Sequence, residues 1–248
     1  MASISVGIFG CGWLGRALAK RLQLHYKVYG AVRSVDSLQK LEKEKITAFK
    51  LPAKDSEFWN VETLVVAISP RQEYLKTMQQ ISENVKARTQ QFILLSTTSV
   101  YQDDDLLITE TSAVDSSKLA VEGENLFKSY WPKGTVIRLA GLMGADRIAG
   151  QWGASVVTNT SVNYVHQVDA VEIISEVIKQ NIHGEIINAV APQHPKRALI
   201  YKMNCDRFGW KIPSFMEGEE KIIAGRKSEI LLRYDYKFQD PMHFWSDN

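Results

Sequence analysis

The sequence is poor in cysteine and has no long apolar run. Two of its 248 residues are cysteines, Cys11 and Cys205, and neither stands at CxxC or metal-ligand spacing. Two isolated thiols favour a reducing compartment over a disulfide framework. The longest apolar runs, such as LVVAI at 64–68, are far too short to span a bilayer. We therefore predict a cytoplasmic protein with no membrane association and no metal site.

A strong excess of one charge is absent as well. The formal net charge is +2, from 30 Lys and Arg against 28 Asp and Glu, and the basic residues are scattered. The sequence therefore shows no cluster of basic residues of the kind that binds nucleic acid, and we expect no nucleic-acid partner. The hydrophobic share of 45% and the charged share of 23% are those of an ordinary globular protein.

Short apolar runs alternate with helix-length amphipathic segments along most of the chain. The runs are β-branched and nearly continuous, which is typical of strands buried on both faces. Strands are expected at 5–9, 27–32, 46–51, 63–68, 91–96, 135–140 and 185–190, and helices at 12–25, 34–44, 71–90, 114–130 and 167–180. This alternation predicts an α/β fold, a Rossmann-type doubly wound parallel sheet with right-handed crossovers.

The alternation weakens after about Asp146. The segment 147–166 is loop-rich, and 191–215 is expected to form a loop, a helix and a turn into Pro213. We therefore predict a small C-terminal lobe on the substrate side. The predicted Rossmann core comprises 1–146 and 166–190, and the predicted lobe comprises 147–165 and 191–248. No linker separates them, so we expect one structural unit.

The stretch GIFGCGWLGRALAKRL at 7–22 carries three glycines at GxGxxG spacing, after a strand and at the start of a helix. Gly10 allows the tight turn, Gly12 lets the backbone approach a pyrophosphate, and Gly15 lets the helix pack close to the strand. The amides and the positive dipole end of that helix suit an anion. The pattern predicts a dinucleotide site; the alternative is a glycine-rich turn that binds no ligand.

The end of the second expected strand bears on the choice of dinucleotide. NAD enzymes usually carry an acidic residue there, which bonds the ribose 2′-hydroxyl. In VYGAVRSVDS at 28–37 the strand ends instead in Arg33 and Ser34, and Asp36 lies past the turn. A guanidinium can bind a 2′-phosphate through two hydrogen bonds. We expect NADP(H), with NAD still possible and a surface role as the alternative for Arg33.

Six later segments carry a resemblance to a known family. They are LLSTTSVY at 94–101, SSKLAVEGENL at 116–126, VIRLAGLMGADR at 136–147, NYVHQVDAV at 163–171, INAV at 187–190 and the tail GRKSEILLRYDYKFQDPMHFW at 225–245. In this order they resemble the extended and atypical short-chain dehydrogenase/reductases, the NAD-dependent epimerase/dehydratase-like group. The resemblance runs along almost the whole chain and implies a dinucleotide cofactor and a small-molecule substrate.

The resemblance also implies roles for individual residues. Lys118 matches the lysine of the family's YxxxK motif, which bonds the nicotinamide ribose, and Thr97 matches the hydroxyl that bonds the substrate oxygen. Val114 stands where the family has its proton-transferring tyrosine. In a helix over 114–130, a tyrosine at 114 would lie one turn before Lys118 on the same face. Without the family, Thr97 would cap a strand and Lys118 would be a solvated side chain.

The predicted site follows from these observations. The expected catalytic residues are Thr97 and Lys118. The expected cofactor-binding residues are Gly10, Cys11, Gly12, Trp13, Leu14, Gly15, Arg33, Ser34, Ser69 and Lys118. Tyr101 is expected to be structural, and His166 with Asp169 to orient a loop and start a helix, with a catalytic His166 as the alternative. The acidic run 103–105 is interpreted as a solvated loop.

Two functions of different classes remain. The first is an NAD(P)-binding oxidoreductase of the epimerase/dehydratase type, acting on an unknown small molecule with NADP(H). The second is a non-catalytic dinucleotide-binding regulator or redox sensor. Thr97 and Lys118 favour the first, whereas Val114 favours the second. We expect a monomer or a homodimer, since the resemblance implies pairing through the helices that include the YxxxK segment.

Overall fold

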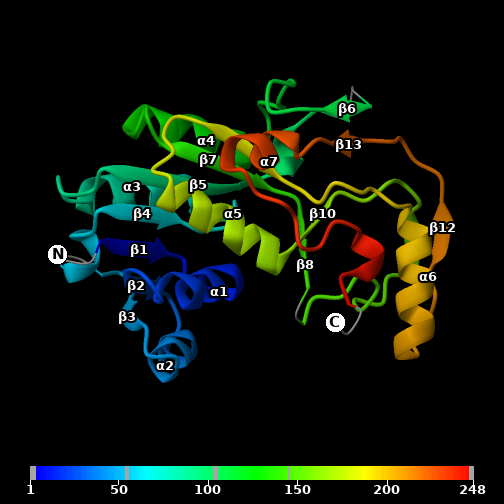
Figure 1. The fold of residues 1–248 in the computed structure, drawn as a ribbon, viewed down its shortest axis with the longest axis horizontal. Coiled ribbons are helices and arrows are strands. Elements are labelled where there is room, and N and C mark those ends of the chain that lie inside the picture. Colours follow the sequence, from blue (N-terminus) through cyan, green and yellow to red (C-terminus); the bar gives the residue numbers. More distant parts are fainter. Residues whose placement is uncertain (1–3, 54–55, 103–105, 145, 246–248) are drawn as a thin grey trace. The chain divides into compact units, whose positions relative to one another are not determined.

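The computed structural model describes residues 4–53, 56–102, 106–144 and 146–245. All seven expected strands form, and they make up one sheet in the order β11-β7-β5-β4-β1-β2-β3 (Figure 1). The strands are β1 (Ser5–Phe9), β2 (Lys27–Val32), β3 (Thr47–Lys50), β4 (Thr63–Val66), β5 (Gln91–Thr97), β7 (Thr135–Leu139) and β11 (Ile186–Ala189). The predicted Rossmann-type α/β fold is therefore confirmed.

The direction in which strands are added reverses next to β1. β1 pairs in parallel with β2 on one side and with β4 on the other, and β2 and β4 pair in parallel with β3 and β5. The connections therefore diverge above the carboxyl ends of β1 and β4. In open α/β sheets this switch point is where ligands bind.

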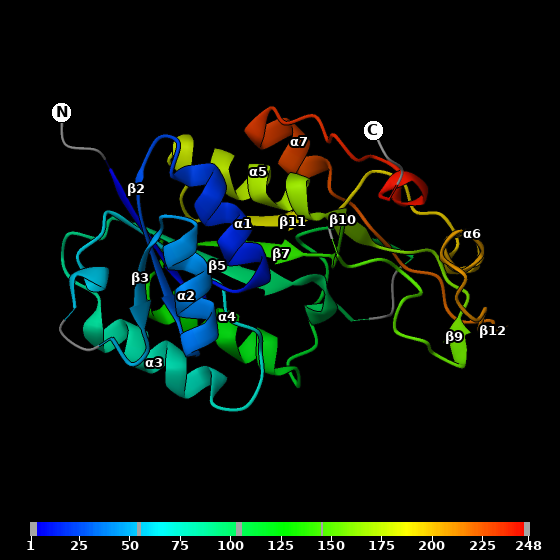
Figure 2. The same ribbon diagram turned by 90° about the horizontal axis from the view of Figure 1, so that it is seen from below.

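Helices follow the strands as predicted, with shorter bounds. They are α1 (Trp13–Leu22), α2 (Val35–Lys43), α3 (Tyr74–Asn84), α4 (Leu119–Tyr130) and α5 (Gln167–Lys179). In Figure 2, α1 and α5 lie on one face of the sheet, and α3 and α4 lie on the other. The side-chain amide of Gln91 in β5 ties the sheet to α5 by donating to the Val177 carbonyl at 3.0 Å.

The expected helix over 114–130 is wrong at its start. Val114 forms an isolated antiparallel bridge with Tyr101, and Lys118 is the extended N-cap of α4. The cause is local, because the Asp115 carboxylate accepts hydrogen bonds from the amide and the hydroxyl of Ser117, at 3.0 and 2.6 Å. Such side-chain bonds to nearby backbone compete with helix formation. The helix therefore begins only at Leu119.

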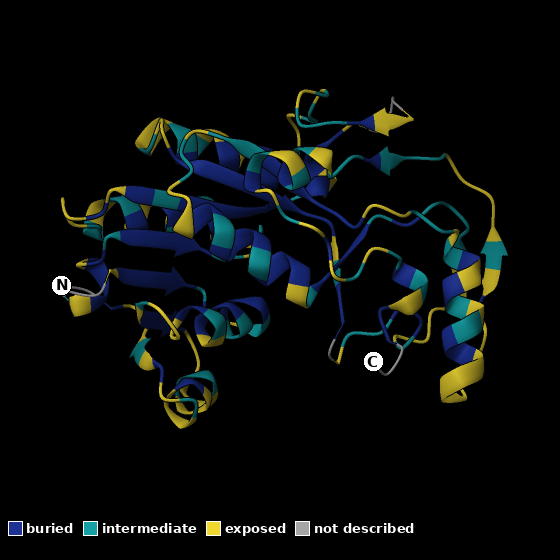
Figure 3. Cartoon of the chain, viewed as in Figure 1, coloured by how far each residue is buried: buried dark blue, intermediate teal, exposed yellow. Residues whose placement is uncertain are grey.

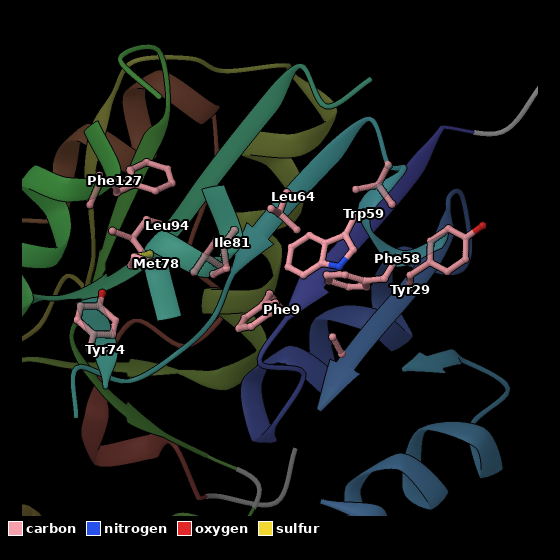
Figure 4. Close-up of a cluster of buried hydrophobic side chains, with 14 residues drawn as sticks. Phe9, Tyr29, Phe58, Trp59, Leu64, Tyr74, Met78, Ile81, Leu94 and Phe127 are labelled. Atoms are coloured by element: carbon pink, nitrogen blue, oxygen red, sulfur yellow. The ribbon is translucent and has the colours of Figure 1, made fainter. Parts of the chain in front are cut away.

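A buried aromatic and aliphatic cluster lies against β1, β2 and β4 (Figure 4). Phe58 contacts Trp59 edge to face, with ring centroids 5.0 Å apart, and Phe9 lies 5.7 Å from Trp59. Apart from the edge strand β3, the strands of this sheet consist mostly of buried residues, which are dark blue in Figure 3. That burial explains why the strand sequences lack alternation of polar and apolar residues.

The chain divides into two compact units, which we describe separately. The first comprises 1–100, 115–138 and 174–186, and the second comprises 101–114, 139–173 and 187–248. The second unit holds the helices α6 (Arg197–Phe208) and α7 (Arg226–Leu232). Its short strands are β6 (Leu107–Ile108), β8 (Gly141–Met143), β9 (Val156–Thr158), β10 (Tyr164–His166), β12 (Ser214–Met216) and β13 (Ile222–Ile223).

The short strands of the second unit pair two by two. β8 pairs with β10, β9 with β12, and β6 with β13, each pair in parallel. A small apolar core that includes Tyr164, Ile200, Phe244 and Trp245 lies beside them. The loop before α6 and the turn after it are where the sequence predicted them. No helix in the described ranges is long and apolar enough to cross a membrane.

The outer edge of β11 is covered by side chains. The amide of Asn188 donates to the Glu110 carboxylate at 2.9 Å, and the amide of Val190 donates to the Tyr236 hydroxyl at 3.2 Å. Ala189, which lies between these two residues, is hydrogen-bonded to the β7 side. The amides of Asn188 and Val190 therefore point away from β7. These two edge amides are therefore satisfied without a further strand.

Candidate functional site

The glycine turn between β1 and α1 has the geometry that the sequence predicted. Gly10 has a φ of +87°, and a Cβ built there would lie 2.5 Å from the Ala67 carbonyl oxygen of the neighbouring β4 connection. The amides of Gly10 and Cys11 both donate to the Ala31 carbonyl oxygen at 3.0 Å. The turn is thus held between the ends of β2 and β4, and only glycine fits at position 10.

The next two glycines differ in what surrounds them. A Cβ at Gly15 would lie 3.1 Å from the Gly10 carbonyl and 3.2 Å from the Ile8 side chain, so Gly15 allows α1 to lie close to β1. A Cβ at Gly12 would meet only the Gly10 carbonyl, at 3.9 Å. The space above Gly12 is open. The backbone can therefore approach a ligand at this position.

The start of α1 faces the same open space. Gly12 is the N-cap, and its carbonyl accepts the amide of Arg16 at 2.7 Å, so the hydrogen bonds within the helix begin there. The amides of Leu14 and Gly15 come before that point and have no acceptor inside the helix. The first turn contains no acidic residue. The positive end of the helix dipole is therefore uncompensated and suits a phosphate.

The Cys11 side chain supports the glycine turn by packing against β2. Its side chain is 2% exposed, and Gly30 of β2 leaves room for its sulfur, since a Cβ at Gly30 would lie 3.1 Å from that atom. Burial, together with the nearby Glu44 carboxylate, raises the pKa of the thiol to about 12. Cys11 is therefore not a reactive thiol.

The residues after β2 are placed at the rim of the glycine turn. Arg33 is exposed, and no hydrogen bond or ion pair engages its guanidinium among the described residues. Ser34 is the N-cap of α2, where its hydroxyl accepts the Ser37 amide at 3.2 Å. Asp36 lies in the first turn of α2 and is exposed. The tip of β2 thus carries the Arg33 guanidinium and the Ser34 hydroxyl, whereas the nearest acidic residue, Asp36, lies in α2.

The ends of β4 and β5 supply two further hydroxyls. Ser69 follows β4 and is exposed. Thr97 ends β5, and its hydroxyl accepts the amide of Ser99 at 3.2 Å and donates to the Ser99 hydroxyl at 3.1 Å. These bonds form a local turn at the carboxyl end of the strand. Thr97 therefore has a capping role, and its partly exposed hydroxyl stays next to the ligand side of the sheet.

Lys118 is placed differently from the expectation. Its ammonium lies 3.7 Å from the Asp115 carboxylate, and about one third of each side chain is exposed. Because Val114 lies in the bridge to Tyr101 and outside α4, positions 114 and 118 do not share a helix face. The hypothesis that a tyrosine at 114 would lie one helical turn before Lys118 is therefore wrong.

Two polar residues outside the turn, Tyr101 and His166, have structural partners. The Tyr101 side chain is fully buried and donates to Asn188 at 2.6 Å. Nδ1 of His166 accepts the amide of Val168 at the start of α5, and its ring stacks on Phe238 with centroids 3.7 Å apart. Burial lowers the pKa of His166, an effect that the charge of Asp169 partly offsets. His166 is therefore neutral near pH 7 and starts the helix.

The sequence analysis missed a buried ion pair next to Thr97. Arg138 of β7 forms two hydrogen bonds with Glu124 of α4, and the Ser96 hydroxyl donates to the same carboxylate at 2.5 Å. The two charged side chains are 4% and 7% exposed. A signal was available, because Glu124 falls in register with the buried Ala120 and Phe127 on one face of the helix.

No metal centre is evident in the part of the chain that the structure describes, where no three His, Cys, Asp or Glu residues converge. The acidic run 103–105, which the sequence analysis interpreted as a solvated loop, lies outside the described residues. In the first unit, the glycine turn and the exposed polar side chains after β2, β4 and β5 gather at the carboxyl ends of the strands.

Comparison with known proteins finds relatives by sequence. Residues 5–99, from β1 to the end of β5, match the model of a family described as NADP oxidoreductase, coenzyme F420-dependent. Over the whole chain, Protein YeeZ of Escherichia coli strain K12 is 28% identical across 268 residues, which covers 96% of this chain and 97% of that protein.

Solved structures of similar fold cover almost the whole chain. UDP-glucuronic acid 4-epimerase from Bacillus cereus, solved in complex with NAD, superimposes with a TM-score of 0.77 at 16% identity, covering 97% of each chain. The human epimerase family protein SDR39U1, solved with NADPH, gives a TM-score of 0.70 at 14% identity, again over 97% of each chain. The chain therefore has the fold that these two proteins share, and the resemblance to the short-chain dehydrogenase/reductases is confirmed at the level of the fold.

Proposed function

We propose that this protein binds NADP(H) at the glycine turn and uses it to oxidise or reduce a small molecule. The observation that carries the proposal is the geometry of the turn. Gly12 opens onto free space at the uncompensated start of α1, while Arg33 stands at the tip of β2. A pyrophosphate suits the first position and a 2′-phosphate suits the second.

The comparisons support this choice of cofactor. The family model matched by the first five strands is described as an NADP oxidoreductase, and the human relative in fold was solved with NADPH. The Bacillus cereus epimerase was solved with NAD. The pattern of this chain, Arg33 and Ser34 without an acidic residue at the strand tip, favours the phosphorylated cofactor.

The bound cofactor would supply the hydride, and the chain would bind and orient both reactants. Thr97, at the end of β5, would hold the substrate oxygen through its hydroxyl, and Lys118 would hold the nicotinamide ribose. Val114 stands where the similar family has its phenol, so this position supplies no acid. The proton that accompanies the hydride would then come from water or from the substrate itself.

A titration with NADPH and NADH, followed by nicotinamide fluorescence, tests the cofactor. We expect NADPH to bind about tenfold or more tightly than NADH, because hydrogen bonds to charged groups contribute about 1.5–3 kcal/mol. Arg33→Gln should remove that preference. The matched control Lys40→Gln, which removes an exposed charge near the other end of α2, should keep it. Gly12→Val should abolish binding of both cofactors, because the added side chain fills the open space.

Equal affinity for the two cofactors in the unaltered protein would exclude Arg33 from the 2′-phosphate role. Absence of binding for both would contradict the proposal as a whole. Lys118→Met should weaken binding of either cofactor without a change in the circular dichroism spectrum. Unchanged affinity would exclude Lys118 from the cofactor site.

A non-catalytic dinucleotide sensor is the second candidate, and the position of Val114 favours it. Catalysis in the similar family needs a phenol and a lysine side by side, whereas here Val114 is held outside α4. A panel of carbonyl and imine compounds, supplied with NADPH, separates the two functions. Steady NADPH oxidation with any of them supports the enzyme. Tight binding without oxidation supports the sensor.

A further inference from the structure

The short strand β12 of the second unit is paired along one edge. It pairs in parallel with β9, and among the described residues these two strands form a sheet of their own. The amide of Ser214 donates to the Ser155 carbonyl at 2.9 Å, and the Met216 carbonyl accepts the amide of Asn159 at 2.7 Å. Successive residues of a strand point their backbone groups to opposite edges. The amide and the carbonyl of Phe215 therefore point away from β9.

This outer edge of β12 carries backbone donors without acceptors. Within the described ranges, no hydrogen bond engages the amide of Phe215 or that of Glu217, the next residue whose backbone points to this edge. Pro213, two residues before Phe215, adds a carbonyl to the edge but has no N–H. The edge of β11 is different, because side chains engage two of its outward amides. Unpaired edge groups are a template for a further strand.

The two faces of this small sheet also differ. The Phe215 ring points to α6, since the Lys202 ammonium lies over it at 5.6 Å from its centroid. Met216 points to the opposite face, where it is 56% exposed, and Val156 of β9 on that same face is 54% exposed. α6 lies beside β12 in both Figure 1 and Figure 2. The sheet is thus packed against α6 on one face and exposed on the other.

We propose that β12 pairs with β12 of a second copy of this chain, antiparallel and across a twofold axis at Phe215. The two Phe215 residues would exchange both backbone hydrogen bonds, and the amide of each Glu217 would donate to the Pro213 carbonyl of the other copy. Every outward donor of the segment 213–217 then has an acceptor. A twofold interface requires a surface that is complementary to itself, and this edge meets that requirement.

The charges beside β12 favour this register over its neighbour. With the axis at Phe215, Lys211 comes opposite Glu219 of the second copy; both side chains are exposed, and the described residues offer neither of them an ion pair. With the axis at Met216, as many hydrogen bonds would form, but Lys211 would come opposite Lys221 of the second copy. Opposite charges across a strand pair are stabilising, and like charges are destabilising.

Sedimentation velocity at protein concentrations from about 1 µM to 1 mM tests the pairing, because this range covers the weak affinity expected of a three-residue strand. We expect a reversible monomer–dimer equilibrium. Phe215→Pro should raise its dissociation constant about 5- to 100-fold, since it removes two hydrogen bonds, one donated by each copy. Proline is tolerated at an edge position whose N–H faces outward. The matched control Phe215→Val loses the ring but keeps the amide, so it should weaken the dimer much less.

Two further comparisons make the test independent of how Phe215→Pro folds. Glu217→Pro and Glu217→Ala both remove an exposed carboxylate outside β12, but only the first removes an amide, so only the first should weaken the dimer strongly. Lys211→Glu should weaken it several-fold at low salt, and the double variant Lys211→Glu with Glu219→Lys should restore it.

Three results would overturn the proposal. The first is a monomer at every concentration. The second is a dimer that neither proline variant weakens more than its control, because such a dimer forms through another surface. The third is a double charge variant that associates no better than Lys211→Glu, because the axis at Phe215 requires these two positions to meet.

Discussion

Two glycines of the turn after β1 stand two residues apart and have opposite surroundings. Gly10 has a positive φ and a carbonyl oxygen 2.5 Å from where its Cβ would be. Gly12 opens onto space that no protein atom fills within 3.9 Å. The first residue is therefore required by the fold, whereas no steric contact of the fold requires a glycine at the second position.

We predict that alanine substitutions separate these two requirements. Gly10→Ala should lower the free energy of unfolding by about 2 kcal/mol or more, because it adds backbone strain to a steric clash. Gly12→Ala should change it by less than about 0.5 kcal/mol while weakening dinucleotide binding. Urea unfolding and nicotinamide fluorescence measure the two effects. A large loss of stability in Gly12→Ala would show that this glycine serves the fold as well.

At the same scale, the sequence predicted some residues correctly and not others. The glycine roles followed from spacing, because a turn between a strand and a helix leaves few conformations. The position of Val114 relative to Lys118 could not be predicted, since it depends on whether Asp115 bonds Ser117 or lets the helix extend. Competition between a side-chain bond and one helical turn is settled by fractions of a kcal/mol.

At the scale of the elements, the Glu124–Arg138 pair joins α4 to β7 beneath the end of β5. The Ser96 hydroxyl of β5 completes the arrangement, so three elements meet at one carboxylate. A buried pair of this kind is costly to break, because the remaining partner is left charged without compensation. The pair therefore holds the middle of α4 against the end of β5 next to Thr97.

We predict that Arg138→Met lowers the free energy of unfolding by about 3–5 kcal/mol, because it leaves Glu124 buried and unpaired. The double variant Glu124→Leu with Arg138→Met should recover most of that loss. Urea unfolding of the three proteins measures the coupling. Equal stability of the single and the double variant would contradict this account of the pair.

Asp169 of α5 plays a corresponding part in the second unit. It is fully buried and accepts hydrogen bonds from the Tyr234 hydroxyl and from the amides of Lys237 and Phe238, at 2.5, 2.8 and 3.0 Å. These bonds tie the C-terminal segment to the helix. The sequence analysis expected Asp169 to start a helix, and partners 65 to 69 residues away were outside what a local motif can predict.

We predict that Asp169→Asn releases this segment before the rest of the fold is affected. Asparagine keeps the shape but accepts fewer hydrogen bonds, so at least one of the three donors loses its acceptor, at about 1–3 kcal/mol each. Brief trypsin digestion should then cut after Lys237 faster than in the unaltered protein, while circular dichroism stays the same. The same cleavage rate in both proteins would show that other contacts hold the segment.

For the whole molecule, the seven strands and the doubly wound parallel fold were predictable, and the short pairings of the second unit were not. Seven strands appear in the sequence as apolar runs because burial on both faces removes polar residues from them. β6, β8, β9, β10, β12 and β13 have two or three residues each, too few for a periodic pattern. Their positions depend on distant partners such as Asn163, which bonds the amide of Ile223.

Buried thiol and phenol groups with raised pKa values make the free energy of unfolding fall at alkaline pH. The pKa of Cys11 is raised from its ordinary value of 9.0 to about 12, and burial also raises that of Tyr236. Unfolding lets these groups ionise, so their contribution is complete below pH 9 and declines as the pH rises towards the folded values. We predict a loss of about 2 kcal/mol from Cys11 alone near pH ~10.5.

Urea unfolding between neutral and alkaline pH measures this slope. The variant Cys11→Ala cannot ionise at this position, so its stability should fall less steeply above pH ~9. Parallel curves for the two proteins would contradict a raised thiol pKa.

The covered edge of β11 has a consequence for the protein at high concentration. An exposed edge strand offers unpaired amides to a strand of another molecule, and such pairing is a common start of aggregation. Here the outward amides of Asn188 and Val190 are already engaged by Glu110 and Tyr236. Two side chains, contributed from segments far away in the sequence, thus take the place of a neighbouring strand at these two positions and leave fewer free donors for the strand of another molecule.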